Sequence, residues 1–540
     1  MNGILPRFKS LFFCCALQLM SNLTAAQQLP VSAFSQLPEF ERPALSPNGT
    51  KLAYINNLGG SSPSSLLATI DLTKGERFLL LNSDNEKVKI NWYRWANEET
   101  LLISARYESS TRGTKYYETR LFAMEYNMNN EPARRLVKAR RGGDHISQFQ
   151  DNVINWLPDD PKHVLVAVDI DIQFLPSVYK MNIDSGRLKR LEKGKLEIRD
   201  WITDQQSQLR VGVSMNYNDG DSTIYVRRKA GKGEDWDKLY TYNAMTEAGI
   251  TPVGFGLDPN LLYFRQYNND KLALYTWNLT TDEQALIYAD PDYDVTGRLL
   301  YSASTRDVIG IAHSNTSTGR IYWDPRYKAL MGGLEKAFPD TDNYLVSFDQ
   351  TENAYIFYNE NDYTPGAYYL GNRKDKTISL LFEQYPALVS AVTEHKKVSY
   401  KTRDGIEIEG YLTLPESPEE GPFPTILHPH GGPGARDYSG FDYWTSFFVN
   451  LGYAVFRPNF RGSAGYGYSF AKSQMKSWGL EMQDDLSDAA QWLIDTEVAD
   501  PDKICIVGAS YGGYATMMAA TKTPDLFTCG VSLAGVSNLR

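Results

Sequence analysis

Cysteine is scarce in this sequence, with four residues in a chain of 540. Cys14 and Cys15 lie near the N-terminus, which leaves Cys505 and Cys529 for the rest of the chain. Two cysteines exclude a disulfide-based scaffold, and their spacing is not that of a metal site. Because both lie in apolar runs, we expect two buried thiols, although an oxidising compartment would also allow a disulfide between them.

Basic residues are outnumbered as well, with 55 Lys+Arg against 65 Asp+Glu and a formal net charge of −10. This balance argues against nucleic acid as a partner, because phosphate binding depends on Lys and Arg. At 42% hydrophobic and 22% charged residues, the composition excludes extensive disorder. No motif for a metal or an organic cofactor is present, so we expect neither.

Long apolar runs are also missing, apart from one short run near the N-terminus. Arg7 and Lys9 precede an apolar run over 10–20, and Ala25-Ala26 supplies small residues for cleavage. These features predict a signal peptide over residues 1–26. The run is too short to persist as a membrane anchor. We therefore expect an exported protein, periplasmic or secreted, without a stable membrane anchor.

A sequence repeat occupies the first two thirds of the chain. A short polar turn followed by an apolar strand recurs seven times between residues 40 and 395, with clear copies at 46–55, 156–166 and 256–264. The interval of roughly 45 to 60 residues is the length that one four-stranded blade needs. Few segments of this region show helical periodicity. We predict a β-propeller of about seven blades over residues 30–392.

The pattern changes after residue 393. Short apolar strands at 425–428, 453–456, 504–507 and 529–533 alternate with helical segments, including an amphipathic helix at about 483–495. This rhythm is typical of a mainly parallel sheet that is covered on both faces. We predict an α/β domain over residues 393–540.

One motif in this domain carries a candidate nucleophile. Gly508-Ala509-Ser510-Tyr511-Gly512 follows a buried strand and precedes a helix. A serine on a sharp strand-to-helix turn needs glycines two residues before and after it, because the backbone folds too tightly for Cβ atoms. The motif therefore predicts a nucleophile elbow, with Ser510 as nucleophile and Gly508 and Gly512 as its flanking glycines.

A second motif offers hydrogen-bond donors for an oxyanion. His430-Gly431-Gly432-Pro433 follows the first strand of the domain, and an acyl-transfer site needs two N–H groups aimed at the oxyanion. We expect the N–H of Tyr511 and the N–H of Gly431 or Gly432 to supply them. His430 precedes the serine in the chain, so we interpret it as a residue that shapes this loop rather than as the base.

Together these segments resemble the prolyl oligopeptidase family of serine peptidases, in its acylaminoacyl-peptidase-like or bacterial dipeptidyl-peptidase-like branch. The matching segments are 430–433, 459–467, 478–479, 484–486 and 508–514. The resemblance implies an α/β-hydrolase domain whose active site is covered by the propeller, so that only peptides and small polypeptides enter. It also implies that Arg461 and Asp484 have structural roles.

The sequence departs from this family in one respect. In this fold the catalytic triad follows the order serine, acid, histidine, but none of the six histidines follows Ser510, and the only later acid is Asp525. We therefore expect the acid and histidine to lie beyond Arg540, and the hydrolase domain to be incomplete. A serine without a base is a weak nucleophile, so residues 1–540 alone would be inactive.

Three functions remain open at this point. The first is a serine peptidase that releases short N-terminal pieces from oligopeptides through an acyl-enzyme on Ser510. The alternatives are a non-catalytic peptide-binding propeller protein and a carboxylesterase, because the same elbow cleaves esters. The sequence indicates neither side-chain specificity, nor whether the substrate amino terminus is free, nor the oligomeric state.

Overall fold

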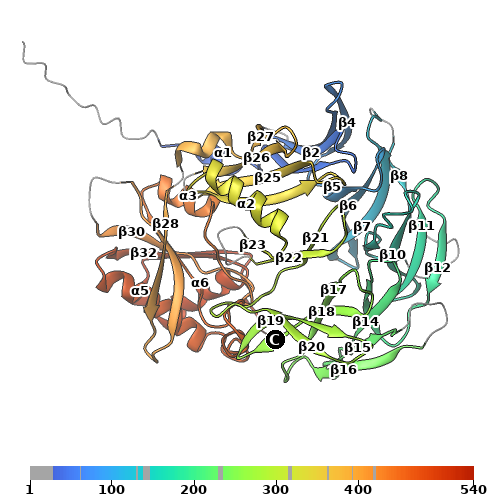
Figure 1. Ribbon diagram of the computed structural model, residues 1–540. Helices are drawn as coiled ribbons and strands as arrows, with labels where there is room; N and C mark the ends of the chain where they lie inside the picture. The colour runs from blue at the N-terminus through green and yellow to red at the C-terminus, as the bar shows by residue number, and fades with distance from the viewer. Residues whose placement is uncertain are drawn as a thin grey trace, which may run out of the picture.

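The computed structural model describes residues 28–539, except 61–62, 129–131, 138–145, 229–234, 314–318, 362–363, 392 and 417–420. The predicted signal peptide therefore lies outside the described residues. The described chain forms a ring of small sheets followed by a separate α/β domain (Figure 1). No helix in the described part of the chain is long and apolar enough to cross a membrane.

Seven antiparallel sheets follow one another along the chain, and each joins its strands in sequence order. The first sheet contains β1 (Phe40–Leu45), β2 (Lys51–Leu58), β3 (Ser64–Asp71) and β4 (Glu76–Ser83). The second contains β5 (Val88–Trp95), β6 (Thr100–Thr111), β7 (Thr114–Glu125) and β8 (Arg134–Arg135). The third contains β9 (Val153–Asn155), β10 (His163–Ile172), β11 (Leu175–Asn182) and β12 (Leu188–Glu192). The next two are β13 (Ile198–Thr203), β14 (Leu209–Met215), β15 (Asp221–Val226) and β16 (Asp237–Asn243), then β17 (Thr251–Phe255), β18 (Leu261–Asn268), β19 (Lys271–Asn278) and β20 (Gln284–Tyr288). The last two are β21 (Leu299–Tyr301), β22 (Val308–Ala312) and β23 (Arg320–Tyr322), then β24 (Asp342–Phe348), β25 (Ala354–Asn361), β26 (Thr364–Asn372) and β27 (Thr377–Glu383). The prediction of a seven-bladed β-propeller is confirmed.

The ring closes through packing between the first and last blades. Leu52 and Tyr54 of the first blade share a buried cluster with Ile356 and Tyr368 of the last. Neighbouring blades also share buried clusters, as Leu102 and Leu121 of the second blade do with Val166 of the third, so the stability of each blade depends on its neighbours. Such a ring has few exposed strand edges.

One helix inside the propeller was not expected. Helix α2 (Pro325–Ala337) follows the sixth blade, which has three strands among the described residues. The Asp324 side chain accepts a hydrogen bond from the Arg326 N–H at its start, and Pro325 occupies the first turn. These are ordinary helix-start signals, and Tyr327, Met331 and Leu334 form the buried face. The repeat of strands in this region led us to expect strands here as well, so the helical spacing of these residues was missed.

The α/β domain is built on one six-stranded sheet with the order β28-β29-β31-β30-β32-β33. Its strands are β28 (His395–Lys401), β29 (Glu407–Thr413), β30 (Phe423–Leu427), β31 (Ala454–Pro458), β32 (Ala499–Ala509) and β33 (Cys529–Leu533). The helices are α1 (Val31–Phe34), which precedes the propeller, then α3 (Tyr443–Asn450), α4 (Tyr468–Lys472), α5 (Glu481–Asp495) and α6 (Tyr511–Lys522), with the short 3-10 helices η1 (Pro386–Ala391) and η2 (Pro524–Leu526). The strands from β31 to β33 pair in parallel, as predicted, whereas β28 and β29 are antiparallel.

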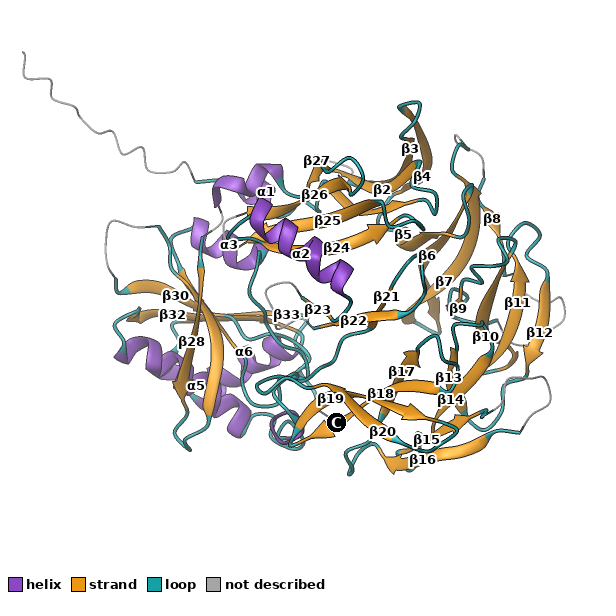
Figure 2. Cartoon of the chain, viewed as in Figure 1, coloured by secondary structure: helices purple, strands orange, loops and turns teal. Residues whose placement is uncertain are grey.

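Alternate residues of the parallel strands explain the two layers of helices. Leu427 and Ile506 point into the core formed with α5 and α6, whereas Ile426 and Val507 pack with α3 on the opposite face. Figure 2 shows α5 and α6 on one side of the sheet and α3 on the other. The sheet is therefore buried on both faces, which accounts for its continuous apolar strands.

The expectation of two buried thiols is wrong. Cys505 and Cys529 form a disulfide with their Cα atoms 4.6 Å apart, and Cys529 is exposed. The cause is strand register, since the two residues are direct partners on the parallel strands β32 and β33. Their Cα separation lies within the usual range for disulfides.

Two groups of contacts join the domains. On one side, Phe34 of α1 meets Phe447 of α3 with ring centroids 5.6 Å apart. On the other, Asp270 of the β18–β19 turn accepts hydrogen bonds from the Ser469 N–H and hydroxyl at 2.9 and 2.7 Å. The Asp294 side chain also accepts from the Gly467 N–H at 3.1 Å. The α/β domain thus contacts both the segment that precedes the propeller and the propeller itself, at points that are far apart in sequence.

Candidate active site

Ser510 lies at the junction where β32 ends and α6 begins. Its backbone has φ 55° and ψ −116°, a conformation that a non-glycine residue adopts only at some cost. Two backbone hydrogen bonds hold it there: the Ser510 N–H donates to the Leu533 carbonyl at 2.9 Å, and the Tyr514 N–H donates to the Ser510 carbonyl at 3.0 Å. The Ser510 residue is exposed. The geometry is that of a strained strand-to-helix turn with an accessible hydroxyl.

The flanking glycines are required by close backbone contacts. A Cβ at Gly508 would lie 2.4 Å from the Gly512 carbonyl carbon, and a Cβ at Gly512 would lie 2.1 Å from the Pro429 carbonyl oxygen. Both distances are far shorter than any carbon–carbon or carbon–oxygen contact in a packed protein. The turn therefore closes only when both positions lack a side chain.

The glycine loop after β30 lies beside the serine. A Cβ at Gly431 would be 3.4 Å from Ser510 Cβ and 3.9 Å from Ser510 Oγ. Tyr511 is the first residue of α6, so its N–H belongs to the first helical turn, whose N–H groups have no intrahelical acceptor. The predicted oxyanion donors, Gly431 and Tyr511, thus come from elements on two sides of Ser510.

The Tyr511 side chain anchors this end of α6 in the core. Its ring lies 4.7 Å from the Trp478 ring and 5.5 Å from the Phe460 ring, measured between centroids, and the residue is 1% exposed. Burial raises the pKa of the Tyr511 hydroxyl, so the hydroxyl stays neutral. Tyr511 therefore offers its backbone N–H to the site while its side chain points into the core.

His430 is engaged on both ring nitrogens. Its ring stacks on Phe460 at a centroid distance of 4.5 Å. Nδ1 lies 2.8 Å from the Gly431 carbonyl oxygen, and Nε2 lies 2.8 Å from the Ser463 Oγ, whose hydroxyl donates to the Phe460 carbonyl at 2.6 Å. Burial lowers the pKa of His430 to about 4, so the ring is neutral at pH 7. His430 thereby fixes the loop that carries Gly431.

A buried ion pair supports the loop over 459–467. Arg461 donates through Nε and Nη2 to Asp485 at 2.9 and 2.6 Å, and their side chains are 7% and 0% exposed. Arg461 also pairs with Asp404 at 2.8 Å. The neighbouring Asp484 instead contacts Arg403 and Lys522 near the surface. The structural role expected for Arg461 is therefore carried with Asp485, which the sequence analysis overlooked.

A signal for Asp485 was present in the sequence. It lies on the apolar stripe of α5, between Met482, Leu486 and Ala489, each of which is fully buried. A charged residue within an apolar helical stripe is expected to have a buried partner. Reading the stripe of α5 residue by residue would have selected Asp485 over Asp484.

None of the described histidines serves as a base for Ser510. Four of them bond elsewhere: His163 to Asp160, His313 to Asp290, His395 to Thr413 and His428 to the Val507 carbonyl. His145 lies outside the described residues, and Asp525 is exposed at the far end of α6. Within the described ranges, no hydrogen bond reaches the Ser510 hydroxyl. That the triad acid and histidine lie beyond Arg540 stays a prediction.

Known proteins are similar to this chain at several levels. Residues 439–540 match the model of the prolyl oligopeptidase family. Dipeptidyl aminopeptidase BIII of Pseudoxanthomonas mexicana is 31% identical over an alignment of 405 residues, which covers 71% of this chain and 56% of that protein. Dipeptidyl peptidase family member 6 of Caenorhabditis elegans is 23% identical over 567 residues, covering 97% of this chain and 73% of that protein.

The fold has solved counterparts as well. The structure of a puromycin-hydrolyzing peptidase of Mycobacterium tuberculosis superposes with a TM-score of 0.66 at 18% sequence identity, over 95% of this chain and 80% of that one. A likeness at this identity concerns the fold, in which a propeller precedes an α/β-hydrolase domain. The chain spans only 56% of the length of the Pseudoxanthomonas relative.

Proposed function

We propose, from the premise that the α/β domain belongs to the prolyl oligopeptidase family, that this protein is a serine peptidase with Ser510 as nucleophile. One observation carries the proposal: Ser510 occupies a strained turn, at φ 55°, beside the Gly431 loop and at the start of α6. The strained conformation exposes the Ser510 hydroxyl, which a nucleophile requires and a serine with a purely structural role does not. The names of the relatives support a peptidase.

The geometry suggests how the peptide bond is cleaved. Ser510 Oγ attacks the carbonyl carbon, and the hydroxyl proton passes to a base outside the described residues. The Gly431 and Tyr511 N–H groups stabilise the negative oxygen of the tetrahedral intermediate. When the intermediate collapses, the C–N bond breaks, the leaving amine takes the proton, and the acyl group remains on Oγ. Water then releases the acyl group.

We further propose short oligopeptides as substrates and release of short N-terminal pieces. The α/β domain is held to the N-terminal segment through Phe34 and to the propeller through Asp270, and this attachment restricts access by folded proteins. Two relatives are named a dipeptidyl aminopeptidase and a dipeptidyl peptidase family member, and these names support cleavage near the amino terminus.

We also propose that the protein is exported to the periplasm or beyond. The N-terminal features of residues 1–26 support a signal peptide. The disulfide between Cys505 and Cys529 supports an oxidising compartment, because structural disulfides are rare in the cytosol.

Fluorophosphonate labelling of the protein purified from its natural source tests the peptidase proposal. We expect one labelled peptide containing Ser510, and loss of the label in Ser510→Ala but not in Ser532→Ala. Hydrolysis of peptide anilides should fall by more than about 10³-fold in Ser510→Ala. Faster cleavage of nitrophenyl acyl esters than of peptide anilides would favour a carboxylesterase. Peptide binding with neither label nor hydrolysis would favour a non-catalytic binding protein.

A further inference from the structure

Seven turns form a rim at one end of the propeller, and each connects the first strand of a blade to the second. These rim turns are residues 46–50, 96–99, 156–162, 204–208, 256–260, 302–307 and 349–353. The first strands are the innermost, since β1 contacts β24 and β5, and β13 contacts β9 and β17 (Figure 2). Neighbouring rim turns also bond to each other: the Asn97 side chain donates to the Pro161 carbonyl at 2.8 Å, and the Gln350 N–H donates to the Pro47 carbonyl at 2.7 Å. The rim therefore surrounds one mouth of the central channel that a propeller encloses.

This rim lies at the end of the propeller that faces away from the α/β domain. Strand β18 begins directly after the rim turn over 256–260 and ends at Asn268, close to Asp270, which contacts the α/β domain. The loop over 459–467 meets the same far end, because the Gly467 N–H donates to Asp294. The same loop reaches His430, beside the glycine loop of the active site, through Ser463. A molecule that enters at the rim would therefore cross the propeller on its way to Ser510.

Solvent reaches the centre of the ring. Arg94 on β5, Asp200 on β13 and Val346 on β24 are exposed, although they lie on innermost strands. Side chains that faced a packed centre would be buried there instead. The centre of the propeller is therefore a channel that is open to water.

One ion pair crosses this channel at the rim. Arg306 lies in the rim turn of the sixth blade and Asp159 in that of the third, and the guanidinium donates to the carboxylate through both Nη atoms, at 2.8 and 3.0 Å. The third and sixth blades are not neighbours, because two blades separate them on one side of the ring and three on the other. Their rim turns can therefore meet only over the propeller axis.

This ion pair has the properties of a contact that both closes and opens. Its two parallel hydrogen bonds are the geometry in which exposed ion pairs contribute most. The Arg306 guanidinium lowers the pKa of Asp159, so the carboxylate is charged at neutral pH. The two side chains are nevertheless 39% and 77% exposed, so water and salt compete with the contact.

The backbone of Arg306 also indicates a role for its side chain. Its φ is 64°, in the left-handed region, where glycine or asparagine would cost less. Arginine therefore brings no advantage to the turn itself. What arginine adds at this position is a long, charged side chain that reaches over the axis to Asp159.

We propose that Arg306 and Asp159 form a gate over the outer mouth of the channel and thereby limit the size of the molecules that reach Ser510 through the propeller. With the pair formed, the two side chains divide the mouth. With the pair broken, they swing aside and a wider molecule passes. The two residues act on the size of the substrate without touching Ser510, and the use of the channel as an entrance rests on the proposed function.

Two fluorophosphonates with the same reactive group test the gate in the full-length protein, one with a small ethyl chain and one with a bulky rhodamine dye. The ratio of their labelling rate constants at Ser510, bulky over small, measures access, because the chemical step is common to both. We expect this ratio to rise about three- to fivefold in Arg306→Asn and in Asp159→Asn. Raising NaCl from about 0.05 M to about 0.5 M should increase the ratio in the unaltered protein but not in these variants, since salt screens an exposed pair.

The neighbouring acid supplies the matched control. Asp160 lies in the same rim turn but pairs with Lys180 of its own blade at 2.6 Å, so Asp160→Asn should leave the ratio unchanged. Exchanging the two charges, Arg306→Asp together with Asp159→Arg, should restore both the ratio and its salt dependence.

The outcomes separate this proposal from the proposed function. Labelling by both probes with an unchanged ratio in Arg306→Asn and Asp159→Asn would overturn the gate and leave the peptidase standing. A decrease in unfolding free energy with that unchanged ratio would show that the pair is only a brace between two blades. A ratio that rises equally in Asp160→Asn would also overturn the gate. Labelling by neither probe would contradict the proposed function itself, and the gate with it.

Discussion

Two pairs of glycines in this protein have opposite surroundings. Gly508 and Gly512 flank Ser510, where a Cβ would lie 2.4 and 2.1 Å from neighbouring backbone atoms. Gly332 and Gly333 lie inside α2, where a Cβ would meet nothing within 4 Å. The first pair is required by the fold of the turn, whereas the second leaves space that the fold does not use. Glycines of the first kind allow the backbone to form a tight turn, whereas glycines of the second kind leave space open beside a helix.

The largest expected effect comes from adding a methyl group at the elbow. Gly512→Ala forces the Pro429 carbonyl away from its position, because the new Cβ would sit 2.1 Å from that oxygen. We expect a loss of more than about 4 kcal/mol in unfolding free energy and no fluorophosphonate labelling at Ser510. Chemical denaturation and labelling measure both effects. Normal labelling of Gly512→Ala would show that the turn tolerates a side chain, and the contrast with the glycines of α2 would then be wrong.

Loss of the buried ion pair between Arg461 and Asp485 should have the next largest effect on the unfolding free energy. Asp485→Asn leaves Arg461 buried with its nearest charge removed, and we expect a loss of about 3 kcal/mol in unfolding free energy. Asp484→Asn is the matched control, because Asp484 is partly exposed and should contribute less than about 1 kcal/mol. Urea denaturation of the two variants decides the assignment. Equal losses would mean that Asp485 is no more important than its neighbour.

The pH dependence of stability should reveal the neutral His430. Its pKa is about 4 in the folded protein and near 6.5 when unfolded, so the unfolded chain binds the proton more readily between these values. Stability is therefore fully present above pH 6.5 and decreases as the pH falls toward 4, by about 2 kcal/mol at pH 5. Denaturation at pH 7 and pH 5 measures this slope.

A variant isolates the contribution of His430 from other buried histidines. His395, whose pKa burial also lowers to about 4, contributes a similar slope. His430→Gln should remove only part of the decrease between pH 7 and pH 5, and Gln can still donate to the Gly431 carbonyl. An unchanged slope in His430→Gln would show that His430 is already protonated or exposed in the native protein.

The features of this protein differ in how well the sequence predicts them. The elbow follows from glycine spacing around one serine, because its constraints are local and leave a short motif. The propeller follows from repetition, because each blade is one local unit. The pairing of Cys505 with Cys529 and the choice of Asp485 over Asp484 depend on strand register and helix rotation. Those relations join residues about 24 positions apart and leave no local pattern.

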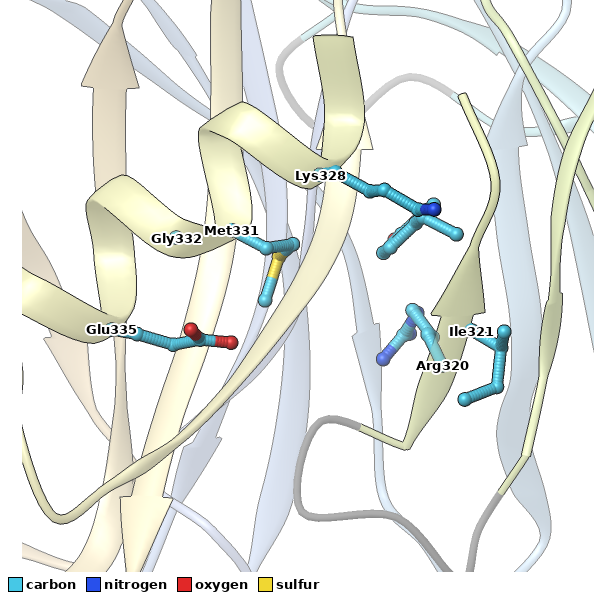
Figure 3. A pocket seen from close by; sticks show the side chains of 7 residues that line it. Arg320, Ile321, Lys328, Met331, Gly332 and Glu335 are labelled. Carbon is cyan, nitrogen blue, oxygen red and sulfur yellow. The ribbon is translucent and has the colours of Figure 1, made fainter. Parts of the chain in front are cut away.

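A pocket of about 230 Å³ between α2 and β23 (Figure 3) was not predictable from residue spacing alone. The helix signals at Asp324 and Pro325 are local, but the pocket also needs Arg320 on a strand and an empty volume between them. An empty volume exists where no side chain fills the space between two elements, and a sequence does not show which of these spaces stay unfilled. Glycines inside a predicted helix are the nearest available signal, because they reduce helix stability without a packing reason.

The smallest expected effect tests that signal directly. Gly333→Ala should increase the unfolding free energy by about 0.5–1 kcal/mol, because alanine is the better helix former and its methyl group meets no neighbour. Gly332→Ala should give the same gain, measured by denaturation, since its surroundings are equally open. A gain at both positions would show that neither glycine is required by the fold. A loss of stability at either position would mean that α2 needs its glycines, and the contrast with Gly508 and Gly512 would fail.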